Sequence, residues 1–148
     1  MAKVDEIDLQ IIRLLQKDAR VSSEVLSGKI HASPTTIRRR IRELIESRVL
    51  RVVALVDPDH VGFPYSVIFA LKVSGNKLEE VLKTLDMREE IKWLVASTGR
   101  FDVLAFARFR NTDDISKFLQ NFIYNTEGVS NCETFVCLQV KKGRYTQV

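Results

Sequence analysis

The segment SPTT at residues 33–36 constrains the fold of this chain most, because it predicts where a helix must begin. Serine is a favourable N-cap residue, and proline fits the first helical position, where its missing N–H is no loss. The apolar residues that follow have the spacing i, i+4, i+7 and i+8, and they are Ile37, Ile41, Leu44 and Ile45. This spacing places them on one helical face, which must be buried against other elements. We predict a helix from Pro34 to about Ser47.

Two shorter apolar stripes precede this helix and predict two more helices. The first follows Asp5, with acidic residues in the first turn, where the helix dipole favours negative charge; its stripe consists of Ile7, Ile11, Leu14 and Leu15. The second is capped by Ser22 or Ser23 and has the apolar positions Val25, Leu26 and Ile30. A tight break at residues 31–32 separates it from the helix at Pro34. Two short helices joined in this way form a helix-turn-helix, whose second helix enters the DNA major groove.

Positive charge is concentrated around this second helix. The whole chain has a net charge of +4, whereas residues 29–51 alone contain seven basic and two acidic residues, which is +5. A run of arginines on an amphipathic helix is more often a solvated face. Here the preceding short helix, the tight turn and the SPTT start favour DNA reading, because arginine binds guanine edges and threonine binds bases or phosphates. The side chains that project away from the apolar stripe are Thr35, Thr36, Arg39, Arg42, Glu43 and Glu46, with Arg38 and Arg40 at its flanks.

The next stretch separates two parts of the chain with different patterns. RVVALVD, residues 51–57, alternates like a β-strand and is interpreted as a wing or as a strand that leads away from the helices. DPDHVGFP, residues 57–64, concentrates proline, glycine and aspartate and is the best candidate for a linker. We therefore expect a DNA-binding domain at 1–50, a strand and linker at 51–64, and a second domain at 65–148.

The second domain has the pattern β-α-β-β-α-β. Strands are predicted at residues 65–73, 91–98, 101–109 and about 132–140, and helices at about 77–86 and from Asn111 or Thr112 onward. Gly99 and Arg100 are expected to form a tight type II′ turn between the two middle strands. This order predicts a ferredoxin-like sheet. The predicted fold class is α+β, with an N-terminal winged helix-turn-helix of three helices followed by a ferredoxin-like βαββαβ domain.

Two helices cover only one face of such a four-stranded sheet, yet the strands have apolar residues on both faces. In the strand at 65–73, Val67 and Phe69 point to one face, and Ile68 and Ala70 point to the other. A second copy of the chain is the simplest partner for the uncovered face, so we predict a homodimer. A two-fold dimer would also present two recognition helices to two DNA half-sites.

The sequence does not favour a metal, cofactor, membrane or catalytic function. His31 and His60 lack metal-ligand spacing and are interpreted as surface histidines, so no metal and no cofactor is expected. Cys132 and Cys137 would lie on opposite faces of one strand, which indicates reduced thiols and a cytoplasmic protein. The chain shows no signal-peptide pattern and no apolar stretch long enough to span a membrane. No catalytic constellation emerges, so the protein is not predicted to be an enzyme.

With these elements in order, the whole chain resembles the Lrp/AsnC family, the leucine-responsive or feast/famine regulators of bacteria and archaea. The motifs that carry the resemblance are SPTTIRRRIRELIESRVL in the helix-turn-helix and STGRFDV in the second domain. The resemblance implies a transcriptional regulator that binds double-stranded DNA, dimerises through the second domain, often assembles into an octamer (a tetramer of dimers), and binds an amino-acid effector between subunits. The residues that match the family's DNA-contacting positions are Ser33, Thr35, Thr36, Arg38, Arg39 and Arg42, and those that match its effector loop are Thr98, Gly99, Arg100, Phe101 and Asp102.

Two residues depart from the family pattern. Arg48 stands where relatives usually have glycine. A left-handed backbone there would cost about 1 kcal/mol, and otherwise the turn after the helix must differ. Arg100 stands where relatives often have a small or acidic residue, which favours an anionic or carboxylate-rich ligand.

Two other functions compete with DNA binding. Sirohaem decarboxylases resemble these regulators in architecture, but their tetrapyrrole would require a histidine in the second domain, and both histidines here precede it. A ligand sensor or docking module without DNA contact would leave the +5 charge of residues 29–51 unexplained.

Overall fold

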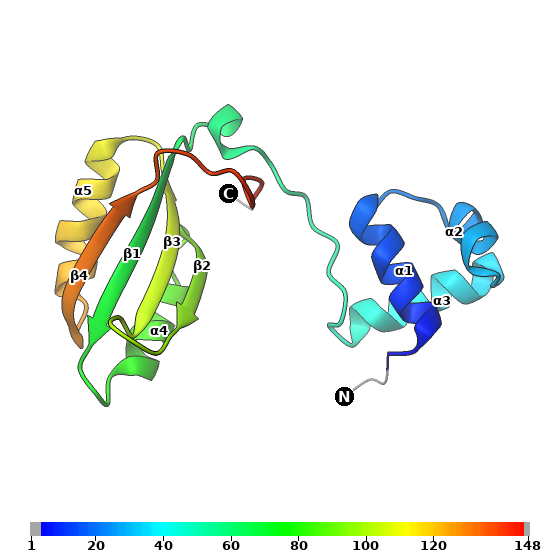
Figure 1. Ribbon diagram of the computed structural model, residues 1–148, viewed down its shortest axis with the longest axis horizontal. Coiled ribbons are helices and arrows are strands. Elements are labelled where there is room, and N and C mark those ends of the chain that lie inside the picture. The colour runs from blue at the N-terminus through cyan, green and yellow to red at the C-terminus, as the bar shows by residue number, and fades with distance from the viewer. Residues whose placement is uncertain (1–3, 147–148) are drawn as a thin grey trace. The chain divides into compact units, whose positions relative to one another are not determined.

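The computed structural model describes residues 4–146, and the chain divides into two compact units, Met1–Val53 and Ala54–Val148. The helices of the first unit, labelled in Figure 1, are α1 (Glu6–Lys17), α2 (Ser23–Ile30) and α3 (Pro34–Glu46). The predicted N-caps of α2 and α3 are confirmed. The Ser22 hydroxyl accepts a hydrogen bond from the Val25 N–H at 3.3 Å, and the Ser33 hydroxyl accepts one from the Thr36 N–H at 3.2 Å.

The three helices bury a small common core, whose fully buried apolar side chains are Ile11, Leu15, Leu26, Ile30, Ile37 and Leu44. The prediction that Val25 and Ile45 belong to this core is wrong, because their side chains are 49% and 44% exposed. Each lies next in sequence to a buried leucine and is therefore rotated by about 100° around the helix axis from it. The packed stripe of these helices is narrower than the apolar pattern indicates.

The predicted strand at residues 51–57 does not form a ladder within the described part of the chain. Its one backbone pairing is an isolated bridge, in which Val56 and Thr146 exchange N–H···O bonds of 3.0 and 3.1 Å. Val52, Val53 and Leu55 are exposed. Alternation shows that a segment suits a strand, but a strand also needs a neighbour with free backbone groups. The expected wing is therefore not formed between residues 4 and 146, and the short 3-10 helix η1 (Pro58–Val61) occupies the predicted linker.

The second unit confirms the ferredoxin-like order β-α-β-β-α-β. Its main elements are β1 (Tyr65–Val73), α4 (Leu78–Asp86), β2 (Ile91–Ala96), β3 (Val103–Phe109), α5 (Thr112–Asn121) and β4 (Val129–Val136), with a short 3-10 helix η2 (Ile123–Asn125) after α5. The strands form one antiparallel sheet in the order β2-β3-β1-β4, and α4 and α5 lie on the same face of it (Figure 1).

The last strand starts and ends earlier than predicted, at 129–136 instead of about 132–140. Gly128, with φ of 94°, ends the preceding turn, and its carbonyl already accepts a hydrogen bond from the Ser74 N–H at 2.8 Å. Pairing with β1 therefore begins at Val129. After the Cys137 N–H has donated to the Ser66 carbonyl, at 2.8 Å, the chain leaves the sheet.

The two faces of the sheet differ as predicted. The helix-covered face is the core of the unit, formed by Val67, Phe69, Leu71, Val81, Leu85, Val103, Ala105, Ala107, Phe109, Ile115, Phe118 and Ile123. On the opposite face, one row of paired residues crosses all four strands and consists of Trp93, Phe106, Ile68 and Phe135. Trp93 and Phe135, at the two ends of this aromatic row, are 51% and 50% exposed. The second unit thus has a sheet face rich in large apolar side chains that its own helices do not cover.

Candidate nucleic-acid interface and effector loop

The first turn of α3 combines a helix cap with small polar side chains. Besides accepting the Thr36 N–H, the Ser33 hydroxyl shares a 2.8 Å hydrogen bond with the Thr36 hydroxyl. Pro34 occupies the first helical position, and Thr35 is exposed. Backbone N–H groups at such a helix start can also bind a phosphate. The structure thus brings Ser33, Thr35 and Thr36 together at the end of α3 that enters DNA in helix-turn-helix proteins.

Three exposed arginines follow on α3. Arg38 donates to the Glu24 carboxylate of α2 at 2.8 Å, and Arg39 forms an ion pair with Glu43 one turn further along α3. Arg42 forms no ion pair with any carboxylate between residues 4 and 146. Exposed ion pairs of this kind contribute little to stability, so their guanidinium groups can exchange a carboxylate for a DNA phosphate. None of the three is needed for the core.

Arg40 has a different role from its neighbours. Its side chain is only 20% exposed, and one guanidinium nitrogen donates to Asp5 at 2.7 Å and to Asp8 at 3.0 Å, both at the start of α1. The hydrogen bonds to Asp8 and Asp5, that to Asp8 first, raise the pKa of Arg40. Its Nε atom is buried without a hydrogen-bond partner among the described residues. Arg40 therefore links α3 to α1 and does not belong to the exposed arginines that are predicted to face DNA.

The turn that ends α3 is a Schellman motif with arginine in the position that favours glycine. The Arg48 N–H donates to the Ile45 carbonyl and the Val49 N–H donates to the Leu44 carbonyl, both at 3.0 Å. Arg48 itself has φ of 59°, so it takes the left-handed backbone. Of the two alternatives for Arg48, a left-handed backbone or a different turn, the left-handed backbone is therefore observed. The turn keeps its ordinary geometry, and Arg48 is strained in it.

The loop predicted to bind an effector joins β2 to β3 and is longer than predicted. Its closing hydrogen bond runs from the Ser97 N–H to the Asp102 carbonyl at 2.9 Å, which leaves residues 98–101 in the loop. The expected two-residue turn at Gly99 and Arg100 is therefore wrong. The strands stop pairing early because the Ser97 hydroxyl binds the Phe101 carbonyl and the Asp102 N–H donates to Leu71 in β1. Gly99 has φ of 120°, a backbone conformation that residues with a Cβ atom rarely adopt.

Both charged side chains of this loop are held by neighbouring strands. The Asp102 carboxylate accepts hydrogen bonds from the Val73 N–H at 2.8 Å and from the Lys72 ammonium at 3.1 Å. These two donors, the backbone N–H first, lower the pKa of Asp102. Arg100 forms an ion pair with Glu133 on β4, and its guanidinium lies 5.3 Å from the centre of the Phe101 ring. The predicted effector residues are thus contiguous, with Thr98 to Arg100 exposed and Phe101 and Asp102 half-buried.

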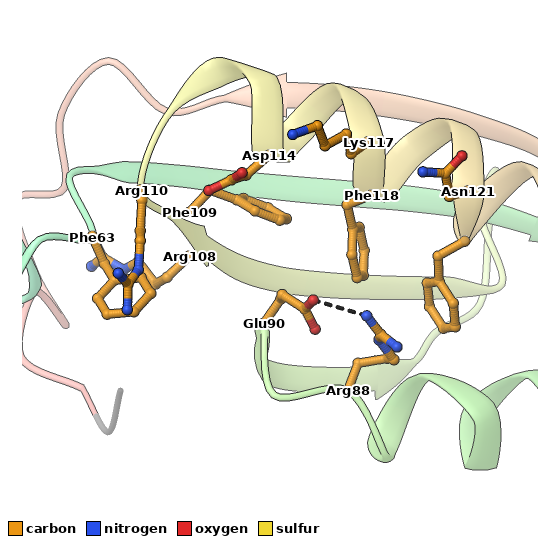
Figure 2. Close-up of a pocket in the computed structure, with 11 residues that line it drawn as sticks. Phe63, Arg88, Glu90, Arg108, Phe109, Arg110, Asp114, Lys117, Phe118 and Asn121 are labelled. Carbon is orange, nitrogen blue, oxygen red and sulfur yellow. Dashed lines mark hydrogen bonds and ion pairs between the residues drawn. The ribbon is translucent and has the colours of Figure 1, made fainter.

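A cavity that the sequence did not predict lies elsewhere in the second unit, and none of its lining residues belongs to the loop at 98–102 (Figure 2). It has a volume of about 470 Å³ and lies between α5 and the segment that connects α4 to β2. Its walls include four phenylalanines and three arginines from segments far apart in the sequence. Each of these residues fits an ordinary core or surface position, so no local pattern signals the cavity.

Residues 4–146 contain neither a metal-binding cluster nor a helix that could span a membrane. No group of three or more histidine, cysteine, aspartate or glutamate side chains is placed to hold a metal ion. No helix in this range is long and apolar enough to cross a bilayer. Cys132 and Cys137 are free thiols, and burial raises the pKa of Cys132, which keeps its thiol protonated.

Both units match known proteins. Residues 4–45 match the family model of the AsnC-type helix-turn-helix domain, and residues 66–146 match that of the Lrp/AsnC ligand binding domain. The chain is 33% identical over 140 residues to the HTH-type transcriptional regulator FL11 of Pyrococcus abyssi, covering 94% of this chain and 92% of FL11. It is 31% identical over 140 residues to the HTH-type transcriptional regulator Ptr1 of Methanocaldococcus jannaschii, covering 94% and 95%.

Solved structures share the fold at lower identity. AsnC of E. coli superposes with a TM-score of 0.83 at 20% identity, over 94% of this chain and 95% of AsnC. The transcriptional regulator NMB0573 of Neisseria meningitidis, solved as a complex with L-Met, superposes with a TM-score of 0.84 at 22% identity, over 95% and 93%. One matched model spans more than half of the chain, and the sequence relatives cover nearly all of it. The chain therefore belongs to the Lrp/AsnC family of transcriptional regulators.

Proposed function

We propose that this regulator reads double-stranded DNA with the exposed side of α3, through Ser33, Thr35, Thr36, Arg38, Arg39 and Arg42. The observation that carries the proposal is that the two sides of α3 have different roles, one in packing and the other exposed to solvent. Ile37 and Leu44 face the core and Arg40 binds α1, whereas the arginines on the other side are held only by exposed ion pairs or by none among the described residues. Arginines that contribute so little to stability are available to bind phosphates and guanine edges.

The functional assembly in this proposal is at least a homodimer. The aromatic row on the uncovered sheet face supports it, since a soluble protein rarely leaves large apolar side chains clustered on its surface. A two-fold pairing of two such faces would bury both rows and give the dimer two recognition helices. Further association of dimers, up to the octamer implied by the family, is part of the same proposal.

The proposed regulatory ligand is an amino acid or a related small molecule bound at a subunit interface near the loop at 98–102. The L-Met complex of NMB0573 supports this ligand class by similarity of fold. In this chain the Gly99 backbone leaves open space around its Cα, which allows close approach of a ligand carboxylate. Because Asp102 is already bound to Val73 and Lys72, a ligand ammonium would have to share its carboxylate with these donors.

We also propose that the protein works in the cytoplasm and has no catalytic activity. The relatives described above are named as transcriptional regulators, which supports this reading. Incubation with sirohaem should release no carbon dioxide, and measurable release would favour the decarboxylase alternative.

DNA binding titrated against salt tests the central proposal. If several phosphates are neutralised, the logarithm of the affinity should fall steeply and linearly with the logarithm of the salt concentration. An Arg39→Ala/Arg42→Ala variant should lose sequence preference and reduce the slope by about 2, which is about one per phosphate contact removed. The matched control is Arg13→Ala/Arg20→Ala, which removes the same charge from exposed positions outside α3. Unchanged affinity and preference in the α3 variant would overturn the assignment.

A further inference from the structure

The cavity beside α5 has an apolar floor made of aromatic rings. Phe109 and Phe118 are buried, with ring centres 5.3 Å apart, and the Phe122 ring lies 5.0 Å from that of Phe118. Figure 2 shows Phe118 pointing from α5 into the space above the segment of Arg88 and Glu90. A volume of about 470 Å³ is within the range of natural small-molecule sites. The space suits the flat or branched apolar part of a small organic molecule.

Two arginines border the cavity with their guanidinium groups held against aromatic rings. The Arg88 guanidinium carbon lies 4.6 Å from the centre of the Phe122 ring, and that of Arg110 lies 4.9 Å from the centre of the Phe63 ring. Stacking of this kind fixes the plane of a guanidinium while its N–H edge remains available. In addition, Nε of Arg88 is buried without a hydrogen-bond partner among residues 4–146. Positioned arginine forks are the usual protein ligands of carboxylates.

The charges around the cavity leave an excess of cations. The lining residues include four cationic side chains, Arg88, Arg108, Arg110 and Lys117, and two acidic ones, Glu90 and Asp114. Glu90 forms an ion pair with Arg88 at 2.9 Å, and the Asp114 carboxylate accepts a hydrogen bond from the Asn111 amide at 3.1 Å. Arg110 and Lys117 form no ion pair within the described part of the chain. The bound group should therefore be an anion and not a cation.

We propose that this cavity is a ligand site, separate from the effector loop, for a small organic carboxylate with an aromatic or branched apolar body. The carboxylate lies against Arg88 and Arg110, with Lys117 adding positive charge, and the apolar body lies on Phe109 and Phe118. A zwitterion binds less tightly, because the acidic groups that could receive its ammonium are already engaged by Arg88 and Asn111. The proposal is independent of DNA binding by α3.

Calorimetry on the full-length protein, with phenylpyruvate as the probe, tests the proposal. We expect saturable binding of phenylpyruvate, at least about tenfold weaker binding of L-phenylalanine, and no binding of acetate, because charge-assisted hydrogen bonds and apolar burial are both needed. An Arg110→Gln/Lys117→Gln variant changes only exposed side chains and should weaken phenylpyruvate binding by about tenfold or more. An Arg88→Lys variant keeps the charge but loses the planar fork, and it should weaken binding similarly.

The matched control is Lys83→Gln/Lys141→Gln, which removes two exposed positive charges outside the cavity. It should bind phenylpyruvate within about twofold of the wild type. Three results would overturn the proposal: no binding of phenylpyruvate up to about 5 mM, affinity unchanged in the Arg110→Gln/Lys117→Gln variant, or binding lost in the control. The last result would show that binding follows the net charge of the protein and not the cavity. DNA binding measured on the same variants keeps this outcome separate from that of the proposed recognition helix.

Discussion

Arg40 of α3 and Asp8 of α1 form a largely buried ion pair, with a guanidinium nitrogen 3.0 Å from a carboxylate oxygen and side chains that are 20% and 12% exposed. The same nitrogen also donates to Asp5. This contact divides the arginine run of α3 into one structural residue and several exposed ones. A single sequence pattern thus serves both the stability of the helix-turn-helix and its charge.

Replacing Arg40 by methionine should lower the free energy of unfolding of the N-terminal unit by about 2 kcal/mol, because the buried Asp8 carboxylate loses its cationic partner. Urea unfolding followed by the amide signals of α1 and α3 measures the effect. Arg39→Met is the matched control and should change the free energy by less than about 0.5 kcal/mol, since the ion pair of Arg39 is exposed. Equal effects of the two substitutions would contradict the distinction between them.

Arg48→Gly should raise the stability of the same unit, because glycine adopts a φ of 59° without the cost that a side chain imposes. The gain should be about 0.5–1 kcal/mol after allowance for the greater freedom of glycine in the unfolded chain. Arg48→Gln removes the same charge and keeps the strain, so it should leave the stability nearly unchanged. The urea midpoints of wild type, Arg48→Gly and Arg48→Gln test this prediction. An Arg48→Gly variant that is no more stable than the wild type would mean that the turn is not strained.

Glu43→Gln should strengthen DNA binding, because it removes the carboxylate that competes with phosphate for Arg39. We expect a gain of a few-fold at low salt that disappears as salt screens the interaction. Glu46→Gln changes the charge of α3 equally but removes no partner of an arginine among the described residues, so it measures the effect of net charge alone. Identical affinities of the two variants would show that the ion pair of Arg39 does not limit DNA binding.

Phe135→Lys should convert the proposed dimer to monomers, because it places a charge at the end of the aromatic row. Light scattering coupled to size-exclusion chromatography gives the mass, and circular dichroism checks that the monomer remains folded. Met87→Lys alters a more exposed apolar side chain that belongs to no strand, and it should leave the assembly unchanged. A dimeric Phe135→Lys protein would rule out this face as the interface.

The Asp102 contacts should make the second unit less stable in acid. Its pKa is lowered in the folded protein by the Val73 N–H and the Lys72 ammonium, so the folded state favours the carboxylate. This contribution is fully present above the unfolded pKa, near 3.8, and is lost as the pH falls through the lower folded value. Melting temperatures of wild type and Asp102→Asn should therefore differ at pH 7 and converge once the pH has fallen below the folded pKa of Asp102. A difference that is constant with pH would exclude this role for the carboxylate.

Local chemistry made much of the fold predictable. The caps at Ser22 and Ser33, the start of α3 at Pro34 and the two faces of β1 depend on near neighbours in the sequence, and all are as expected. The errors come from contacts between distant residues. Among residues 4–146, the segment at 51–57 has no neighbouring strand beyond one isolated bridge, and the start of β4 is set by the hydrogen bond between Ser74 and Gly128.

In the candidate sites too, features set by near neighbours in the sequence were predictable and contacts between distant residues were not. The spacing along α3 predicts which side of the helix is exposed, and this does not depend on the rest of the fold. In contrast, the partners of Arg38, Arg40 and Asp102 lie 14 to 35 residues away in the sequence, so their ion pairs could not be foreseen. The cavity beside α5 was missed for the same reason, because its walls come from separate segments.

The central position of β1 restricts how this protein can change length during evolution. Consecutive residues of β1 alternate between the helix-covered core and the outer face that carries the aromatic row, so one strand serves both the internal packing and the proposed interface. A one-residue insertion or deletion in β1 would move Val67 and Phe69 to the outer face and Ile68 to the inner one. Folding and assembly would then fail together, so indels that survive selection should fall in the loops or arrive in pairs within the strand.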